Sequence, residues 1–97
     1  MALYSDGEVM EIPWWVYILE CADGTLYTGA TPNVRSRLIK HNKGKASKYT
    51  RSRLPVKVVW RQEHPNKSIA MKREAAIKKL TRKQKEDMIA GKYAECH

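Results

Sequence analysis

Two tyrosines stand ten residues apart in the stretch VYILECADGTLYTG, which covers residues 16–29. A phenol donates and accepts hydrogen bonds, and it can carry a proton when its surroundings shift its pKa from about 10. Tyr17 and Tyr27 can act together only if the fold brings their hydroxyl groups to one place. The alternative is that the two rings are merely packing partners on neighbouring strands.

The same stretch is typical of a β-hairpin, with two strand-like runs around Ala-Asp-Gly. Because side chains alternate between the faces of a strand, the loop length decides which residues share a face. A two-residue loop would place the tyrosines on opposite faces. A three-residue loop with Gly24 in the left-handed position would place Tyr17 opposite Gly29 and diagonal to Tyr27. Gly24 favours the three-residue loop, and we expect open space beside the tyrosines at Gly29.

A helix is expected after the hairpin, with Thr31 as its cap and Pro32 in its first turn. Arg37 and His41 are four residues apart, so they share one face of this helix. An arginine holds phosphate oxygens through its planar guanidinium group, and a histidine can accept a proton near neutral pH. The alternatives are a solvated arginine and a half-exposed histidine that the helix dipole stabilises in its charged form.

One carboxylate, Glu74, stands in a later helical stretch that is otherwise rich in lysine and arginine. It is the only acid between Glu63 and Glu86. An isolated carboxylate can bind a cation, which here could be a metal ion or a neighbouring side chain. The alternative to a metal is an ion pair with Lys78, four residues later on the same helix face.

A basic segment covers residues 43–53, where five of eleven residues are lysine or arginine. Such cations can contact phosphates, and an aromatic ring among them can stack on an unpaired base. We expect nucleic-acid contacts from Arg35, Lys43, Lys45, Lys48, Tyr49, Arg51 and Arg53. The alternative is an ordinary solvated loop.

The charge of the whole chain points the same way. The 97 residues carry a formal net charge of +9, but residues 1–34 hold five acids and no lysine or arginine, and all 19 basic residues follow. This excess favours nucleic acid as the partner. No apolar run is long enough to span a membrane, and no stretch pairs a basic face with a bulky apolar face. A basic surface without any partner remains the alternative.

The length predicts one domain, and the pattern predicts the order ββαβαα. We expect an α+β fold in which three helices flank a small three-stranded antiparallel sheet. Residues 1–12 read as a loose arm, 13–91 as the domain and 92–97 as a tail, with a basic loop at 43–54. The two cysteines form neither a disulfide framework nor a metal motif, which favours a reducing, cytoplasmic compartment.

Several short motifs, taken in order, resemble the GIY-YIG nuclease superfamily over residues 13–90. They also resemble its small single-domain branch, the UPF0213 or YhbQ-like proteins. The motifs are VYI at 16–18, YTG at 27–29, HN at 41–42, KYTR at 48–51 and REAAIKKL at 73–80. The first two read VYI and YTG where the superfamily name has GIY and YIG. An arginine also stands ten residues after the second tyrosine.

The resemblance implies an endonuclease that hydrolyses phosphodiester bonds with a divalent metal, Mg²⁺ or Mn²⁺. Tyr17 and Tyr27 then match the tyrosines of the two motifs, and Arg37 matches the helical arginine. His41 stands at a position that family members fill with His or Tyr. Glu74 matches the metal-binding glutamate. Tyr17, helped by His41, would orient or deprotonate the attacking water, and Tyr27 would hydrogen-bond the phosphate or that water. We expect the metal and Arg37 to lower the pKa of Tyr17.

The expected substrate is DNA in preference to RNA, in DNA repair or in the processing of structured or single-stranded nucleic acid. No membrane and no obligate protein partner are expected. The alternative function is a catalytically silent module that binds nucleic acid as an accessory factor. Only the nuclease requires Glu74 to face Arg37 and the two tyrosines.

Overall fold

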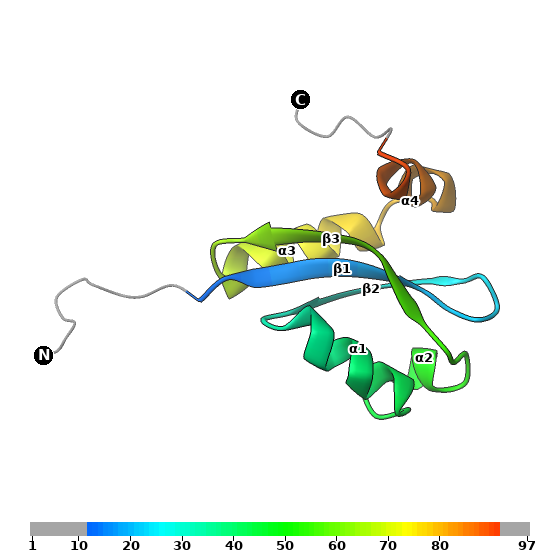
Figure 1. The fold of residues 1–97 in the computed structure, drawn as a ribbon. Coiled ribbons are helices and arrows are strands. Elements are labelled where there is room, and N and C mark those ends of the chain that lie inside the picture. The colour runs from blue at the N-terminus through cyan, green and yellow to red at the C-terminus, as the bar shows by residue number, and fades with distance from the viewer. Residues whose placement is uncertain (1–11, 92–97) are drawn as a thin grey trace, which may run out of the picture.

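A three-stranded antiparallel sheet forms the centre of the molecule (Figure 1). The structure, a computed structural model, describes residues 12–91. The strands are β1 (Trp14–Glu20), β2 (Leu26–Thr31) and β3 (Lys57–His64), and β1 lies in the middle in the order β2-β1-β3. This confirms the predicted α+β fold and the element order. The predicted C-terminal tail and all but one residue of the predicted N-terminal arm lie outside the described residues.

Helices cover both faces of the sheet (Figure 1). Helices α1 (Val34–Asn42) and α2 (Lys48–Arg51) lie on one side, while α3 (Lys67–Lys78) and α4 (Arg82–Ile89) lie on the other. The one-turn helix α2 is an addition, because residues 43–54 were predicted to be a loop. The described residues contain no helix long and apolar enough to cross a membrane.

The side chains before each helix explain where the helices begin. The Asn33 side chain accepts a hydrogen bond from the Ser36 N–H, so Asn33 caps α1 and the predicted cap at Thr31 was wrong. Thr31 is the last residue of β2, and its hydroxyl oxygen accepts a hydrogen bond from the Asn33 N–H. The predicted capping box of the last helix is confirmed, with Thr81 and Gln84 bonded reciprocally.

The hairpin between β1 and β2 has the predicted three-residue loop. The Cys21 N–H donates to the Thr25 carbonyl at 2.9 Å, and Gly24 closes the loop at φ 85°. The register then places Tyr17 opposite Gly29 and Leu19 opposite Tyr27. Because side chains alternate, the two tyrosines share one face of the sheet, as predicted.

The two faces of β1 lead into two different cores. On the α3 side, Val16 and Ile18 pack with three buried apolar residues of the helices, which are Ala70, Ile77 and Met88. On the α1 side, Tyr17 and Leu19 pack with Cys21 and Val56. The second core contains a buried phenol, so it needs hydrogen-bonding partners that the first core does without.

Candidate active site

A chain of three buried polar groups crosses the α1 side of the sheet. The Tyr17 hydroxyl oxygen lies 3.0 Å from Nε2 of His41, and Nδ1 of the same ring lies 2.8 Å from Oγ1 of Thr50. Tyr17 comes from β1, His41 from α1 and Thr50 from α2. Three separate elements therefore meet at one imidazole ring, and both of its nitrogens are hydrogen-bonded.

Thr50 decides which nitrogen of His41 carries the proton. We assign the tautomer by letting the Thr50 hydroxyl donate to the Ser47 carbonyl at 3.4 Å, which leaves its oxygen to accept from Nδ1–H of His41 at 2.8 Å. Nε2 is then an acceptor, and the Tyr17 hydroxyl donates to it. Thr50 had no role in the sequence prediction, because a contact between residues 41 and 50 depends on how α2 folds back. The stretch KYTR was noted for its cations, its tyrosine and its resemblance to a family motif, and none of these pointed to Thr50.

Helix α1 buries His41 through its position on the helix. Val34, Leu38 and His41 are spaced by four and three residues, so His41 continues the stripe that faces the sheet. The histidine is only 1% exposed, which makes the alternative of a half-exposed, charged histidine wrong. The next residue fixes the end of the helix, because the Asn42 side chain bonds both the N–H and the carbonyl of Val56 at 2.8 and 3.0 Å.

Gly29 gives room to Tyr17. A Cβ atom placed on Gly29 would lie 2.5 Å from the Tyr17 hydroxyl oxygen and 2.6 Å from Cζ. The ring of Tyr17 therefore lies across the backbone of β2, and the expected open space at Gly29 is filled by the tyrosine. The glycine allows the phenol to reach past β2, which corrects the expectation that it leaves space for a ligand.

Burial raises the pKa of Tyr17 above the ordinary phenol value, and the nearby Tyr27 raises it further. Arg37 acts in the opposite direction, and the negative charge of Glu74 adds to the increase. The expectation that Arg37 would lower this pKa is met only as a minor contribution, because burial outweighs it. Tyr17 is thus a protonated hydrogen-bond donor at neutral pH, within reach of the charges of both Arg37 and Glu74.

The pKa of His41 is shifted in the opposite sense. Burial lowers the pKa of the imidazole below its ordinary value, and the positive charge of Arg37 lowers it further. His41 is therefore neutral at pH 7 and can accept a proton on Nε2. The protonated phenol and the neutral imidazole form a matched donor and acceptor pair.

Glu74 lies on the side of α3 that faces the sheet. It comes four residues after Ala70 and three before Ile77, both of which are fully buried. Its side chain is 14% exposed and makes an ion pair with Lys78 at 3.3 Å. The predicted alternative, an ion pair along the helix, is thus present, and the same carboxylate also acts electrostatically on Tyr17.

One protein carboxylate at this site fits a magnesium-like ion. Among residues 12–91 there is no group of three or more His, Cys, Asp or Glu side chains that could hold a metal. Mg²⁺ does not need such a group, because it binds through one or two carboxylates and keeps several waters or phosphate oxygens as ligands. The donor set therefore suits a hard divalent ion that is completed by water and substrate, and Glu74 would be its protein ligand.

Aromatic rings continue from His41 toward the surface. The Tyr27 ring lies edge-on to His41, with centroids 5.2 Å apart, and is stacked with Tyr49, with centroids 5.9 Å apart. The guanidinium carbon of Arg53 lies 4.0 Å from the centre of the Tyr49 ring. Tyr49 was predicted to stack on an unpaired base, but in this structure it already has contacts with Tyr27 and Arg53.

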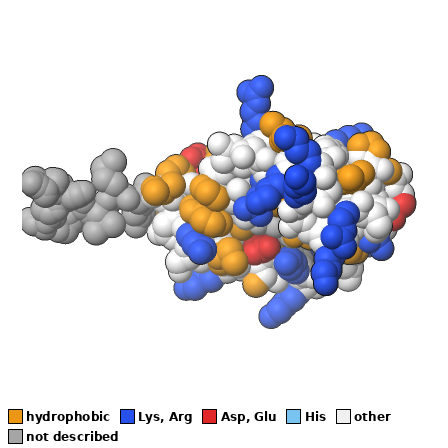
Figure 2. Space-filling view, turned by 90° about the horizontal axis from the view of Figure 1, so that it is seen from below, with side chains coloured by type: hydrophobic (Ala, Val, Ile, Leu, Met, Phe, Trp, Pro, Cys, Tyr) orange, Lys and Arg blue, Asp and Glu red, His pale blue; other side chains and the backbone are white. Residues whose placement is uncertain are grey.

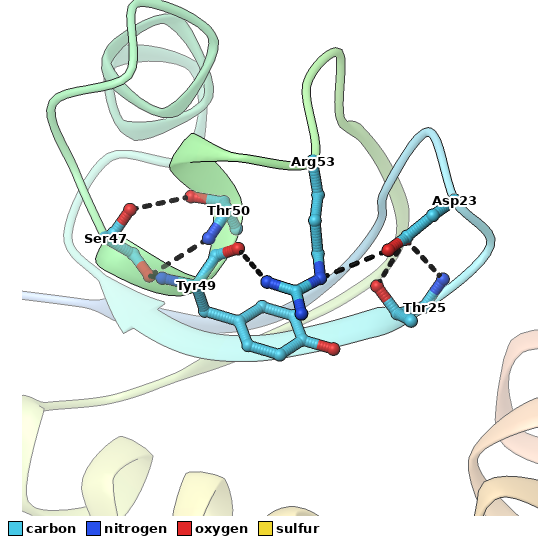
Figure 3. A network of polar contacts seen from close by, with 6 residues as sticks. All are labelled: Asp23, Thr25, Ser47, Tyr49, Thr50 and Arg53. Carbon is cyan, nitrogen blue, oxygen red and sulfur yellow. Dashed lines mark hydrogen bonds and ion pairs between the residues drawn. The ribbon is translucent and has the colours of Figure 1, made fainter.

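A polar network holds Tyr49 beside the hairpin loop (Figure 3). Arg53 donates to the Tyr49 carbonyl at 2.7 Å and to the Asp23 carboxylate at 3.1 Å. Asp23 in turn accepts hydrogen bonds from the N–H and the hydroxyl of Thr25, which lower the pKa of the Asp23 carboxyl group. Arg53, predicted as a phosphate contact, is therefore engaged with an acid of the same chain.

The other cations of the predicted nucleic-acid surface are exposed. They are Arg35, Lys43, Lys45, Lys48 and Arg51. Figure 2 shows the molecule from the side of α1 and α2, where lysine and arginine side chains spread over much of the surface and acidic ones are few. This face presents a positive surface next to the buried Tyr17–His41 pair.

The chain is similar to known proteins over most of its length. A family model described as the GIY-YIG catalytic domain matches residues 13–87. A UPF0213 protein of Streptococcus sanguinis is 54% identical over 76 residues, which cover 78% of this chain and 87% of the relative. A UPF0213 protein of Staphylococcus epidermidis is 52% identical over 75 residues, which cover 77% and 92%.

Two solved structures share the fold. The solution structure of a UPF0213 protein from Bacillus halodurans has a TM-score of 0.54 and 43% identity, covering 86% of this chain and 88% of that one. The solution structure of a protein from E. faecalis has a TM-score of 0.57 and 41% identity, covering 88% and 91%. The similarity therefore extends over nearly the whole described chain.

Proposed function

The chain belongs to the GIY-YIG family of nuclease domains and to its small UPF0213 branch, and we propose that it is a divalent-metal-dependent endonuclease. Its substrate would be nucleic acid, with DNA preferred over RNA. The observation that carries the proposal is the buried hydrogen bond between Tyr17 and His41, which lies within the fields of Arg37 and Glu74. The phenol and the imidazole are in direct contact, and the charges of Arg37 and Glu74 both act on the pKa of Tyr17.

The hydrogen bonds suggest how a water molecule is activated. Tyr17 accepts a proton from the attacking water while its own proton passes to Nε2 of His41. The raised pKa of Tyr17 disfavours a free phenolate, so the two transfers belong to one step. The lowered pKa of His41 keeps Nε2 unprotonated and ready to accept. Because Tyr17 is only 2% exposed, this water would be a bound one rather than bulk solvent.

The remaining side chains would hold the phosphate. Arg37 would bind phosphate oxygens through its guanidinium group, and Tyr27 would hydrogen-bond the scissile phosphate or the attacking water. Glu74 would be the protein ligand of Mg²⁺ or Mn²⁺. The bound ion would act as a Lewis acid that neutralises charge on the phosphate and on the leaving oxygen.

Exposed cations would hold the rest of the nucleic acid. Arg35 lies in α1, and the four exposed cations of the basic segment, at positions 43, 45, 48 and 51, lie in α2 or in the loop that joins α1 to it. These two helices lie on the same side of the sheet as the Tyr17–His41 pair (Figure 1). Phosphate contacts of this kind give affinity without sequence specificity. We therefore expect DNA repair or the processing of structured or single-stranded DNA to be the setting.

The test compares Glu74→Gln with a matched control, Glu63→Gln, which removes an exposed acid from β3. Labelled single-stranded, duplex, flap and RNA substrates are incubated with Mg²⁺, Mn²⁺ or EDTA. We expect the wild type and Glu63→Gln to cleave only with metal, and Glu74→Gln to lose cleavage while circular dichroism shows that it is folded. Cleavage that survives both EDTA and Glu74→Gln contradicts the proposal. Binding by the wild type without cleavage under every condition supports the accessory module instead.

A further inference from the structure

A cleft of about 240 Å³ has Tyr27, a ring neighbour of His41, in its wall. Its walls come from β2, α2, α3 and α4, and the residues are Leu26, Tyr27, Thr28, Tyr49, Lys78 and Lys85. Tyr27 thus belongs both to the candidate active site and to this cleft. The two lysines come from the α3 and α4 side of the sheet, which the sequence did not associate with nucleic acid.

Lys85 differs from the other cations of its helix. Arg82 pairs with Glu86 at 2.8 Å and Lys83 pairs with Asp87 at 3.4 Å, each four residues apart. The neighbours of Lys85 at that spacing are Thr81 and Ile89, so neither is an acid, and Glu86 and Asp87 pair with the other two cations. Within residues 12–91 no carboxylate pairs with Lys85, although its side chain is half-buried. A lysine that lines a cleft and has no counter-charge can bind an anion there.

Lys78 connects the cleft to the candidate metal ligand. Its ammonium group lies 3.3 Å from Glu74, while its side chain is 54% exposed and lines the cleft. An anion in the cleft would therefore meet two lysines, and it would lie next to Tyr27. Tyr49 also lines the cleft, and it belongs to the basic segment together with Lys48 and Arg51.

We propose that this cleft binds a backbone phosphate of the nucleic acid next to the phosphate that Tyr27 contacts. Lys85 and Lys78 hold this second phosphate, and the strand then runs from the basic segment, past Tyr27, to helix α4. The inference rests on the proposed function, because it places the substrate strand of that same site. Lys85 is thereby a substrate-binding residue from the last helix of the domain.

The experiment compares Lys85→Gln with Lys83→Gln, which removes one cation from the same helix. Binding of a fluorescently labelled oligonucleotide is followed by anisotropy in EDTA at several chloride concentrations. We expect Lys85→Gln to weaken binding to any sequence and to reduce the slope of log affinity against log salt by about 1. Lys83→Gln and Lys85→Arg should keep the wild-type slope, and thermal melting should show all three variants folded. With metal present, Lys85→Gln should raise KM and leave kcat within about twofold.

Equal slopes for Lys85→Gln and Lys83→Gln overturn the phosphate site, even when the wild type cleaves DNA normally. In that case the proposed nuclease function stands. If the wild type neither binds nor cleaves any nucleic acid, both proposals fail. Inorganic phosphate at matched ionic strength is added as a competitor. We expect phosphate to displace DNA more readily from the wild type than from Lys85→Gln, because the anion and the strand compete for the same lysine. Equal displacement from both proteins would contradict the site.

Discussion

The two faces of strand β1 carry opposite kinds of core. The α3 side of the strand presents Val16 and Ile18 to an apolar cluster. The α1 side presents Tyr17, which needs a hydrogen-bond partner and finds it in His41. Both faces are equally well buried, so burial alone does not distinguish them.

The two faces differ in the kind of contact that their side chains require. Apolar packing is non-directional and needs only matching volume, whereas a buried phenol needs one partner at hydrogen-bond distance. The α1 side therefore depends on several segments at once, including Gly29 for space and Thr50 for the proton position. One strand can thus give the domain its stability through one face and its chemistry through the other.

The strongest test of this division is Tyr17→Phe. We expect kcat to fall by about 10²- to 10⁴-fold, because the proton of the attacking water loses its acceptor. The free energy of unfolding should fall by about 1–3 kcal/mol, since Nε2 of His41 is left without a partner. Single-turnover cleavage and urea unfolding measure the two effects. Unchanged cleavage would remove Tyr17 from the mechanism.

Ile77→Ala tests the apolar face. Ile77 is fully buried, so we expect the free energy of unfolding to fall by about 2–5 kcal/mol. The cleavage rate per folded molecule should stay within about twofold of the wild type, because no reacting group is touched. Ile69→Ala on the same helix is the control, since Ile69 is exposed and its removal should change stability little. A large loss of kcat at full folding would show that the two faces are coupled.

Gly29→Ala tests whether space on the α1 side is as restricted as the structure indicates. The added methyl group would meet the Tyr17 ring, so we expect a loss of about 1–3 kcal/mol in stability together with lower activity. In the double variant with Tyr17→Leu, the loss of stability should be smaller than the sum of the two single losses, because the smaller side chain removes the clash, and activity should stay low. Additive losses in the double variant would argue against the contact.

The smallest expected effect is a pH dependence of stability that comes from His41. Its pKa in the folded chain lies below the ordinary value of 6.5, so the unfolded chain binds a proton more readily. The free energy of unfolding should therefore fall as the pH drops below the ordinary histidine pKa of 6.5. The pKa of His64 is lowered in the same sense by burial and by Arg73, so some dependence should remain in His41→Gln. Urea unfolding of the wild type and of His41→Gln at about pH 7 and pH 5 checks this prediction. The same pH dependence in the two proteins would show that groups other than His41 cause it.

Local pattern was enough to predict most of the fold. The position of Gly24 predicted the three-residue loop, and that loop determined the shared face of Tyr17 and Tyr27. The helix cap was wrong by two residues because both Thr31 and Asn33 have capping side chains. The short helix α2 was missed because four residues give no periodicity to detect.

The site was less predictable, because its details depend on tertiary contacts. The spacing of Val34, Leu38 and His41 could have predicted a buried histidine, since it repeats the stripe of a helix that faces a core. Nothing local connects Thr50 to His41 or Lys85 to Tyr27, because each pair meets only when separate elements pack. The direction of the Tyr17 pKa shift also depended on burial, which the sequence does not measure.

The ion pair between Asp23 and Arg53 affects how strongly the binding of a polyanion to this surface should depend on salt. A lysine or arginine that neutralises a phosphate releases a cation condensed on the nucleic acid, and this release sets the salt dependence of binding. Arg53 already has a carboxylate at 3.1 Å, so it neutralises a phosphate only if Asp23 gives way. The number of ions released on binding should therefore be smaller than the number of cations that touch the polyanion.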